Sequence, residues 1–489
     1  MARGLQQTDT PLLTALAEQA GRAHARFYAP GHKGGQGIPT ALKTLLGPAV
    51  FRADLPELPE LDNLFAPEGV IAAAQTLAAE AFGAERSWFL ANGSTGGIEA
   101  AVLAACGPGD LILVPRNAHR SVISALILSG ARPVWVQPDY DADWDLVHGV
   151  LPQTIQRGLQ QFPETRAVLL TSPTYHGVCS PVAAIAEVVH GRGLPLLVDE
   201  AHGAHFAFHP ALPPSALAAG ADVVVQSTHK VLSAMTQASM LHGQGNRIDW
   251  RRLQQALALT QSTSPNYVLL ASLDAARQQM ALQGQQYLQQ TLALAERVRG
   301  QIAALPGLRP LQTTDLPRIG AWTLDTTRLT VEVAGLGLSG FEADMYLHRE
   351  LGVTAELPTL RHLTFILSLG NTEAEGTRLV QAFGTLAASS GAAAPMPTGT
   401  LTMSEPVSVP PYSPRQAFFA PNQACPIEAA QGHLSAECVC PYPPGIPTLL
   451  PGEMISRDAI ATLQVIHRSG GIITGCSDPS LTTLRVIHP

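Results

Sequence analysis

A series of short apolar runs between residues 71 and 260, separated by helical stretches, constrains the fold of this chain more than any other feature. The runs are "RSWFLA", "DLILVPRN", "RPVWVQPD", "RAVLLTSPT", "LPLLVDEAH" and "ADVVVQSTHK". Continuous apolar runs of this length that alternate with helices are typical of a parallel sheet buried on both faces. We therefore predict an α/β fold. Because ligands of such sheets bind outside the carboxyl ends of the strands, we expect the site among the polar residues that follow each run.

Turn-forming residues and composition divide the rest of the chain. Its 489 residues allow about three domains at the usual ~150 residues each. A long helix is predicted over residues 268–305, and two strand-like runs after it, "TRLTVEVAG" and "HLTFILSLGN", indicate a smaller α+β unit. The predicted segments are an N-terminal arm (1–70), a large domain (71–268), a small α+β domain (269–386), a linker (387–400) and a C-terminal α+β domain (401–489).

Charge and cysteine usage exclude several classes of partner and compartment. Charged residues make up 14% of the chain and the net charge is −8, without a basic run, which argues against nucleic acid or an anionic membrane as partner. No apolar run approaches the ~18 residues that a membrane span needs, and the first residues lack a signal-peptide pattern. The six cysteines form no CxxC pair. We therefore expect a cytoplasmic protein with reduced thiols.

Two strand ends carry residues that suit a phosphate group. After "RSWFLA" the sequence "NGSTGGIEA" opens a helix with Ser94, Thr95 and Gly96, whose N–H groups and hydroxyls could bind phosphate. A helix that starts with Ser, Thr and Gly is also what an ordinary N-terminal cap looks like. Ser227, which follows the run "ADVVV", offers one more hydroxyl.

Lysine is scarce in this chain. Only Lys33, Lys43 and Lys230 occur, although lysine and arginine together number 30. Lys230 follows a strand end and precedes small and apolar residues. An amine can form a Schiff base with an aldehyde, whereas a guanidinium stays protonated and cannot. We therefore predict that Lys230 is the nucleophile toward the aldehyde of pyridoxal 5'-phosphate (PLP), an ordinary surface lysine being the alternative.

The other strand ends supply what the PLP ring needs. Asp199 ends an apolar strand and suits a carboxylate that keeps the pyridine nitrogen protonated, so that the ring acts as an electron sink. His119 is the candidate for stacking on the ring, with an ordinary loop histidine as the alternative. A metal site at the Asp199 strand end, built from His202 and His205, lacks further ligands at a recognisable spacing, and we expect no metal.

Nine stretches, in order along nearly the whole chain, resemble one enzyme family. They are "APGHKGG", "DLPELPELDNLFAPEG", "NGSTGGI", "PRNAHRSVISALILSGA", "TSPTYHGV", "VDEAHGAHF", "QSTHKVLSAMTQASMLH", "STSPNYVLLASLDAAR" and "CPYPPGIPTLLPGE". The family is that of the Orn/Lys/Arg decarboxylases, PLP enzymes of the aspartate-aminotransferase fold (fold type I). The chain is similar to the compact, biosynthetic arginine decarboxylases among them.

The resemblance implies an activity and a role for each candidate residue. The activity is PLP-dependent α-decarboxylation of a basic amino acid, L-arginine to agmatine in polyamine biosynthesis first, then lysine or ornithine. Lys230 would be the Schiff-base lysine, Asp199 the pyridine partner and His119 the stacking residue. The phosphate-binding residues would be Ser94, Thr95, Gly96 and Ser227. His202 and His229 would flank the cofactor, and either His229 or Lys230 would return a proton to Cα.

Carboxylates should receive the basic end of the substrate. We rank Glu453 and Asp54 first and Glu57 next, because "PGE" and "RADLPEL" lie in stretches that the family folds over the cofactor. Each of these acids could equally cap a turn and face solvent.

The family also implies a homodimer or an assembly of dimers. The segment "QSTSPNYVLL", with Ser264 and Tyr267, is similar to one that reaches a neighbour's cofactor. Two alternatives stay open. One is an aminotransferase or aldolase on the same fold, in which Arg361 would bind the α-carboxylate, and the other is a non-catalytic PLP-binding protein.

Overall fold

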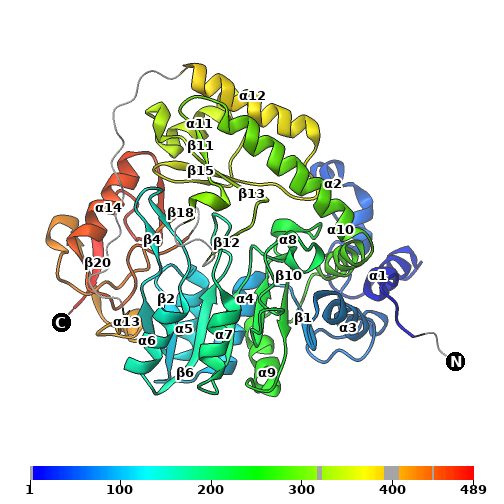
Figure 1. The fold of residues 1–489 in the computed structure, drawn as a ribbon. Helices are drawn as coiled ribbons and strands as arrows, with labels where there is room; N and C mark the ends of the chain where they lie inside the picture. Colours follow the sequence, from blue (N-terminus) through cyan, green and yellow to red (C-terminus); the bar gives the residue numbers. More distant parts are fainter. Residues whose placement is uncertain (1–3, 317–321, 390–406, 443–444, 489) are drawn as a thin grey trace.

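An eight-stranded sheet forms the centre of the molecule (Figure 1). The computed structural model describes residues 4–316, 322–389, 407–442 and 445–488. The strand order is β1-β10-β9-β8-β6-β2-β3-β16. The strands, in that order, are Arg86–Leu90, Ser239–Gly243, Val223–Gln226, Leu196–Asp199, Thr165–Thr171, Leu111–Pro115, Arg132–Val136 and Val407–Ser408. The five from β9 to β3 are parallel, while β10 and β16 run antiparallel to their neighbours.

Helices cover both faces of this sheet, as the apolar runs predict. One face packs against α4 (Gly93–Ala105), α5 (Arg120–Ser129) and α9 (Trp250–Thr260). The other face packs against α6 (Pro152–Gln161) and α7 (Val182–His190). Along β2, Ile112 and Val114 join the first core and Leu113 joins the second. Each strand is therefore apolar on both sides because neither side meets water.

The long helix α10 (Tyr267–Ala303) connects the large and small domains. Its first half packs with the core of the arm and the large domain, and its second half packs with the core of the small domain. The predicted helix over 268–305 is therefore confirmed, but the predicted boundary at residue 268 falls inside its first turn. Its N-terminus is capped by Asn266, whose side chain accepts the N–H groups of residues 268 and 269.

The small domain is a four-stranded sheet covered by helices. Its order is β11-β13-β15-β14, and every neighbouring pair is antiparallel. The strands are Arg309–Pro310, Arg328–Glu332, His362–Ile366 and Leu357–Pro358. Helices α11 (Gly340–Glu350) and α12 (Glu373–Ser389) complete its core with the end of α10. Short strands β7 (Val178–Cys179) and β12 (Thr323–Leu324) pair across to the large domain.

The N-terminal arm is held onto α10 by a buried ion pair. The arm contains α1 (Pro11–Gly21), α2 (Thr40–Ala53) and α3 (Val70–Phe82). Asp274 accepts the N–H of Leu12 at 3.0 Å, and its partner Arg277 donates to the carbonyl oxygens of Gln7 and Asp9. Asp274 and Arg277 are both fully buried, so the start of the arm is part of the folded core.

The C-terminal segment has a small core of its own and also extends the central sheet. Its elements are α13 (Pro414–Phe419), β17 (Asn422–Pro426), β18 (Cys440–Tyr442), α14 (Arg457–Arg468), β19 (Ile472–Thr474) and β20 (Thr483–Ile487). Strand β16 pairs with β3, so this segment is attached to the large domain through the sheet. The predicted linker 387–400 begins in the last turn of α12, and the rest of it lies outside the described residues. Among the described helices, none has the length and apolar character needed to cross a membrane.

Candidate active site

The polar residues predicted from the strand ends meet at one edge of the central sheet. Asp199 ends β8, and Ser227 and Lys230 follow β9, the strand beside it. His119 follows β2 at the start of α5. Because these strands are parallel, their carboxyl ends lie at the same edge. The α/β arrangement therefore brings residues together that are more than 100 positions apart in the chain.

Lys230 is mostly buried and lies beside two aromatic rings. It lies in the single turn α8 (Thr228–Val231), and its Nζ is 3.0 Å from Nε2 of His202. Nζ also lies 5.7 Å from the centre of the Tyr175 ring. Burial lowers the pKa of the Lys230 ammonium below its usual range, against the opposing charge of Asp199. This environment suits an amine that must lose its proton to react.

Asp199 is a buried carboxylate with one described hydrogen-bond donor. Its Oδ1 accepts the N–H of Ala201 at 3.2 Å, and the residue is 5% exposed. Burial raises the pKa of this carboxyl, and the charge of Lys230 acts in the opposite direction. A cation placed against Asp199 would relieve the unfavourable burial of its charge.

The residues predicted for phosphate binding come together at the start of α4. Ser94 lies in the first turn of the helix, and its Oγ accepts a hydrogen bond of 2.8 Å from Ser227 Oγ. A Cβ on Gly97 would lie 2.6 Å from Leu90 and 2.8 Å from Val225, so glycine lets the helix start lie directly on the strand ends. The hydroxyls of this turn, at the N-terminus of a helix, form a site suited to an anion.

His119 is a neutral ring covered by the C-terminal segment. Burial lowers the pKa of its imidazole to about 4, with the charges of Lys230 and Arg120 acting in the same direction. The N–H of Arg120 donates to the carbonyl of Gly445 at 3.2 Å. Gly445, in the described part of the C-terminal segment, therefore lies beside His119.

His229 and His202 flank Lys230 from different segments. Nδ1 of His229 lies 2.9 Å from the carbonyl of Ala238, and burial lowers the pKa of its ring. His202 follows β8, and its ring lies 4.6 Å from that of Tyr175. Burial, followed by the charge of Lys230, holds the pKa of His202 well below its usual range. Both histidines are therefore neutral near pH 7.

The three acids predicted to read the substrate lie in two distant places. Asp54 follows α2 in the arm and pairs with His32 at 3.0 Å, and Glu57 accepts a hydrogen bond from Asn63. Glu453 belongs to the C-terminal segment, whose helix α14 lies on the opposite side of the molecule from α2 (Figure 1).

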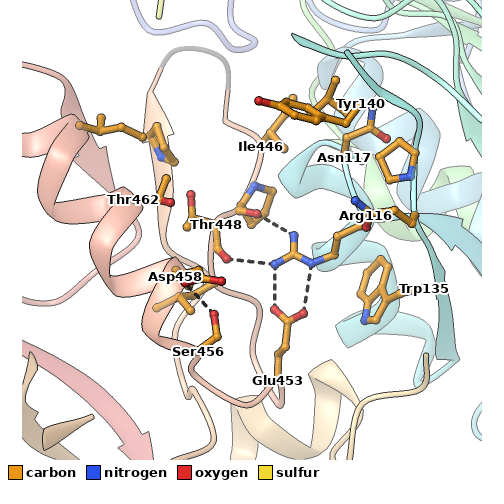
Figure 2. Close-up of a pocket in the computed structure, with 18 of the residues that line it drawn as sticks. Arg116, Asn117, Trp135, Tyr140, Ile446, Thr448, Glu453, Ser456, Asp458 and Thr462 are labelled. Atoms are coloured by element: carbon orange, nitrogen blue, oxygen red, sulfur yellow. Dashed lines mark hydrogen bonds and ion pairs between the residues drawn. The ribbon is translucent and has the colours of Figure 1, made fainter. Parts of the chain in front are cut away.

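Glu453 lies in a cavity of about 450 Å³ between the large domain, the small domain and the C-terminal segment. Figure 2 shows its carboxylate paired with the guanidinium of Arg116, which follows β2. The two contacts are 2.8 Å and 3.2 Å, and Arg116 also donates to the carbonyls of Pro447 and Thr448. The charge of Glu453 is therefore balanced within the protein.

Two functional candidates in the small domain are missing from the sequence-based set. Arg328, the first residue of β13, is 1% exposed and donates to His202. Glu356 is exposed just before β14, and its charge opposes the burial that lowers the pKa of Lys230. Neither residue follows a strand of the central sheet, so the signal that identifies Asp199 and Lys230 does not apply to them.

Two residues considered for other roles have partners inside this chain. Arg361, the candidate of the aminotransferase alternative, is paired with Glu332. Tyr267 is fully buried, and its hydroxyl donates to the carbonyl of Asp62 at 2.5 Å. Ser264 is exposed. Of the segment expected to reach a neighbour, Ser264 therefore faces outward and Tyr267 points inward.

Comparison with known sequences identifies the family. The major domain of the Orn/Lys/Arg decarboxylases matches residues 10–375, and their C-terminal domain matches residues 398–472. The chain belongs to the Orn/Lys/Arg decarboxylase family. This member is 37% identical to an arginine decarboxylase of Halalkalibacterium halodurans over 99% of this chain and 98% of the relative. It is 36% identical to an arginine decarboxylase of Bacillus subtilis over 99% of each chain.

Solved structures confirm the predicted fold class. A lysine decarboxylase of Francisella novicida superimposes with a TM-score of 0.80 over 98% of this decarboxylase and 81% of that chain, at 20% identity. The constitutive lysine decarboxylase of Escherichia coli gives a TM-score of 0.81 over 98% and 82%, also at 20% identity. The fold of this family member is therefore the α/β architecture of fold type I.

Proposed function

We propose that this enzyme decarboxylates L-arginine to agmatine and CO₂ with PLP as its cofactor. The observation that carries the proposal is the likeness, at 36–37% identity over 99% of the chain, to three proteins named arginine decarboxylase. The arrangement of Lys230, Asp199 and His119 supports it, because each has the environment that its proposed role needs. The family match favours decarboxylation over the aminotransferase, aldolase and non-catalytic alternatives.

The described residues fit PLP on chemical grounds. Asp199 is a buried carboxylate that would gain from a cationic partner such as a pyridinium N–H. Ser94 and Ser227 offer hydroxyls to a phosphate beside the start of α4, and we assign Thr95 and Gly96 to the same group. The neutral ring of His119 can lie against an aromatic face. Lys230 supplies the amine.

Each step of the reaction assigns work to a residue of this chain. When bound, PLP supplies an electron sink for the pair of electrons that CO₂ leaves behind. Lys230 would hold the aldehyde carbon of PLP through its amine nitrogen. Asp199 would accept the ring N–H and keep the ring cationic. His229 or Lys230 returns a proton to Cα, and His202 positions Lys230 at 3.0 Å.

A carboxylate near Lys230 should receive the guanidinium of the substrate. We propose Glu356 for this role, because it is exposed and its charge opposes the burial that lowers the pKa of Lys230 and of Arg328. Asp54 and Glu57 stay candidates from the arm. Glu453 is the weaker candidate, since Arg116 already balances its charge.

Release of CO₂ from arginine tests the proposal directly. The purified protein with PLP should release CO₂ from arginine with a higher kcat/KM than from lysine or ornithine, and agmatine should accumulate. Lys230→Ala should abolish release, whereas the matched variant Lys43→Ala, at an exposed lysine of α2, should keep it. Formation of a keto acid without CO₂ would instead establish an aminotransferase.

We also propose a homodimer or an assembly of dimers. The support is the family resemblance of residues 261–270, in which Ser264 is exposed at the surface. Sedimentation of the PLP-loaded protein should give at least twice the mass of the 51.5 kDa chain. A fully active monomer would contradict this assembly.

A further inference from the structure

Three side chains from three segments form a hydrogen-bonded row that ends at Lys230. Arg328 lies on β13 of the small domain, and His202 lies in the loop after β8 of the large domain. Nη2 of Arg328 donates to Nδ1 of His202 at 3.1 Å and to the carbonyl of His202 at 3.1 Å. On the far side of the ring, Nε2 of His202 lies 3.0 Å from Nζ of Lys230.

The guanidinium fixes the direction of every hydrogen bond in this row. A guanidinium keeps its protons in proteins and has no acceptor, so Arg328 can only donate to Nδ1 of His202. Nδ1 therefore carries no proton, and the imidazole is neutral with its proton on Nε2. The Nε2–H group must donate to Nζ of Lys230. An ammonium has three donors and no lone pair, so only an uncharged amine can accept this bond.

We propose that Arg328 holds Lys230 as an uncharged amine by fixing the proton of His202 on Nε2. Arg328 thus acts through His202 and is a positioning residue. The inference deepens the proposed function, since it concerns the lysine assigned to PLP. It concerns hydrogen bonds within the chain, so it can be tested on cofactor-free protein, apart from the reaction.

The groups around Lys230 have opposing effects on its pKa. The titratable and charged groups that face it are Asp199, His202, His119, His229, Tyr175, Arg328 and Glu356. The two carboxylates favour the ammonium, whereas burial and the guanidinium disfavour it. Burial is the largest of these effects and lowers the pKa of Lys230. The contact of Arg328 with His202 adds one further effect, because it directs the Nε2–H group of His202 at Nζ of Lys230.

An uncharged Lys230 matters because only the free amine can add to an aldehyde carbon. A C–N bond forms, the carbonyl oxygen leaves as water, and that water takes both hydrogens of the amine. An ammonium would first have to lose a proton inside a buried site. The row therefore prepares the lysine for capture of PLP near neutral pH and for its recapture after each turnover.

The scarcity of lysine allows a direct measurement. In cofactor-free protein labelled with ¹⁵N in lysine and histidine side chains, the three lysines give three Nζ signals, and Lys33 and Lys43 serve as internal references. The Lys230 signal should titrate below the usual range of a lysine, because burial lowers its pKa. The His202 signals, identified by their loss in His202→Gln, should show a protonated Nε2 and an unprotonated Nδ1.

Variants separate the row from the other effects. Arg328→Met removes the donor, so the titration midpoint of Lys230 should rise by about one pH unit, and capture of PLP by the cofactor-free protein at pH 7 should slow about tenfold. The matched control Arg309→Met changes an arginine on the neighbouring strand β11 that is paired with Asp143. It should leave the Lys230 midpoint unchanged.

The wild-type spectra decide the matter even if Arg328→Met does not fold. A proton on Nδ1 of His202, or an ammonium at Lys230 near pH 7, would overturn the proposal. An unchanged Lys230 midpoint in a folded Arg328→Met protein would also overturn it. Wild-type protein that shows the expected signals but binds no PLP would refute the proposed function and leave this inference standing.

Discussion

Changing Glu453 to glutamine tests whether this carboxylate serves the domain interface or the substrate. Its side chain is 26% exposed and that of Arg116 is 11% exposed. The pair has two N–O contacts, and Glu453 also accepts the N–H of Leu450 at 3.3 Å. Arg116 belongs to the large domain, so the pair holds the C-terminal segment against the carboxyl end of β2.

The expected loss of stability follows from this partial burial. Breaking a fully buried pair by removing one partner costs about 3–5 kcal/mol. An exposed pair contributes about 0–1 kcal/mol. The Arg116–Glu453 pair lies between these limits, and a glutamine keeps one acceptor oxygen for the guanidinium. We therefore expect Glu453→Gln to lower the free energy of unfolding by about 2 kcal/mol, while KM for arginine changes less than about threefold.

Urea unfolding of the cofactor-free protein, followed by circular dichroism, measures this loss. Arg116→Met should lose a similar amount, and the double variant should lose clearly less than the sum, because both changes remove the same pair. Glu428→Gln, at an exposed acid of the same C-terminal segment, is the matched control and should be neutral. If Glu453→Gln leaves stability unchanged and raises KM for arginine tenfold or more, Glu453 reads the substrate and the interface argument is wrong.

Three further predictions follow from the site and the core. Asp199→Asn should keep much of the PLP binding, measured by equilibrium dialysis, but lower kcat by orders of magnitude, because the ring loses the carboxylate that keeps it cationic; near-normal kcat would contradict the assigned role. Glu356→Gln should raise KM for arginine about tenfold or more without weakening PLP binding, since a guanidinium loses its charge partner; an unchanged KM would place the recess elsewhere. His242 is fully buried, and burial lowers the pKa of its ring to about 3. A histidine in the unfolded chain has a pKa near 6.5, above that of folded His242. The neutral His242 therefore contributes its full stability above about pH 6.5, and this stability is lost as pH falls toward 3. His242→Gln should therefore flatten the fall in unfolding free energy between pH 6 and pH 4 by about 1.4 kcal/mol per pH unit, and parallel pH profiles in urea titrations would refute this.

The sequence predicts the central sheet and the residues at its edge because one physical rule covers both. Strands covered by helices on both faces must be continuously apolar, which makes runs such as 111–115 and 196–199 visible. Parallel strands bring their carboxyl ends together, so Asp199 and Lys230 can be placed in one site without knowledge of any distance. The contact between Ser94 and Ser227 follows from the same rule.

Residues placed by domain packing could not be found in this way. Arg328 reaches His202, and the charge of Glu356 acts on Lys230, only because the small domain packs against the large domain, and no local sequence pattern gives that packing. Many strands are followed by a polar residue, so the position of Arg116 after β2 does not predict a partner. Its pairing with Glu453 depends on how the C-terminal segment packs against the large domain. The inward position of Tyr267 likewise depends on the arm, whose Asp62 carbonyl accepts its hydroxyl.

The pairing of β16 with β3 bears on the order in which the protein is made. Strand β3 has β2 on one side, and its other edge is covered by residues 407 and 408. During synthesis this edge of the sheet stays open until the ribosome has produced the C-terminal segment. An unpaired edge can pair with strands of other chains. A nascent chain halted before residue 407 should therefore need chaperone protection that the full chain does not. Residues 407 and 408 protect the edge of β3 from pairing with other chains.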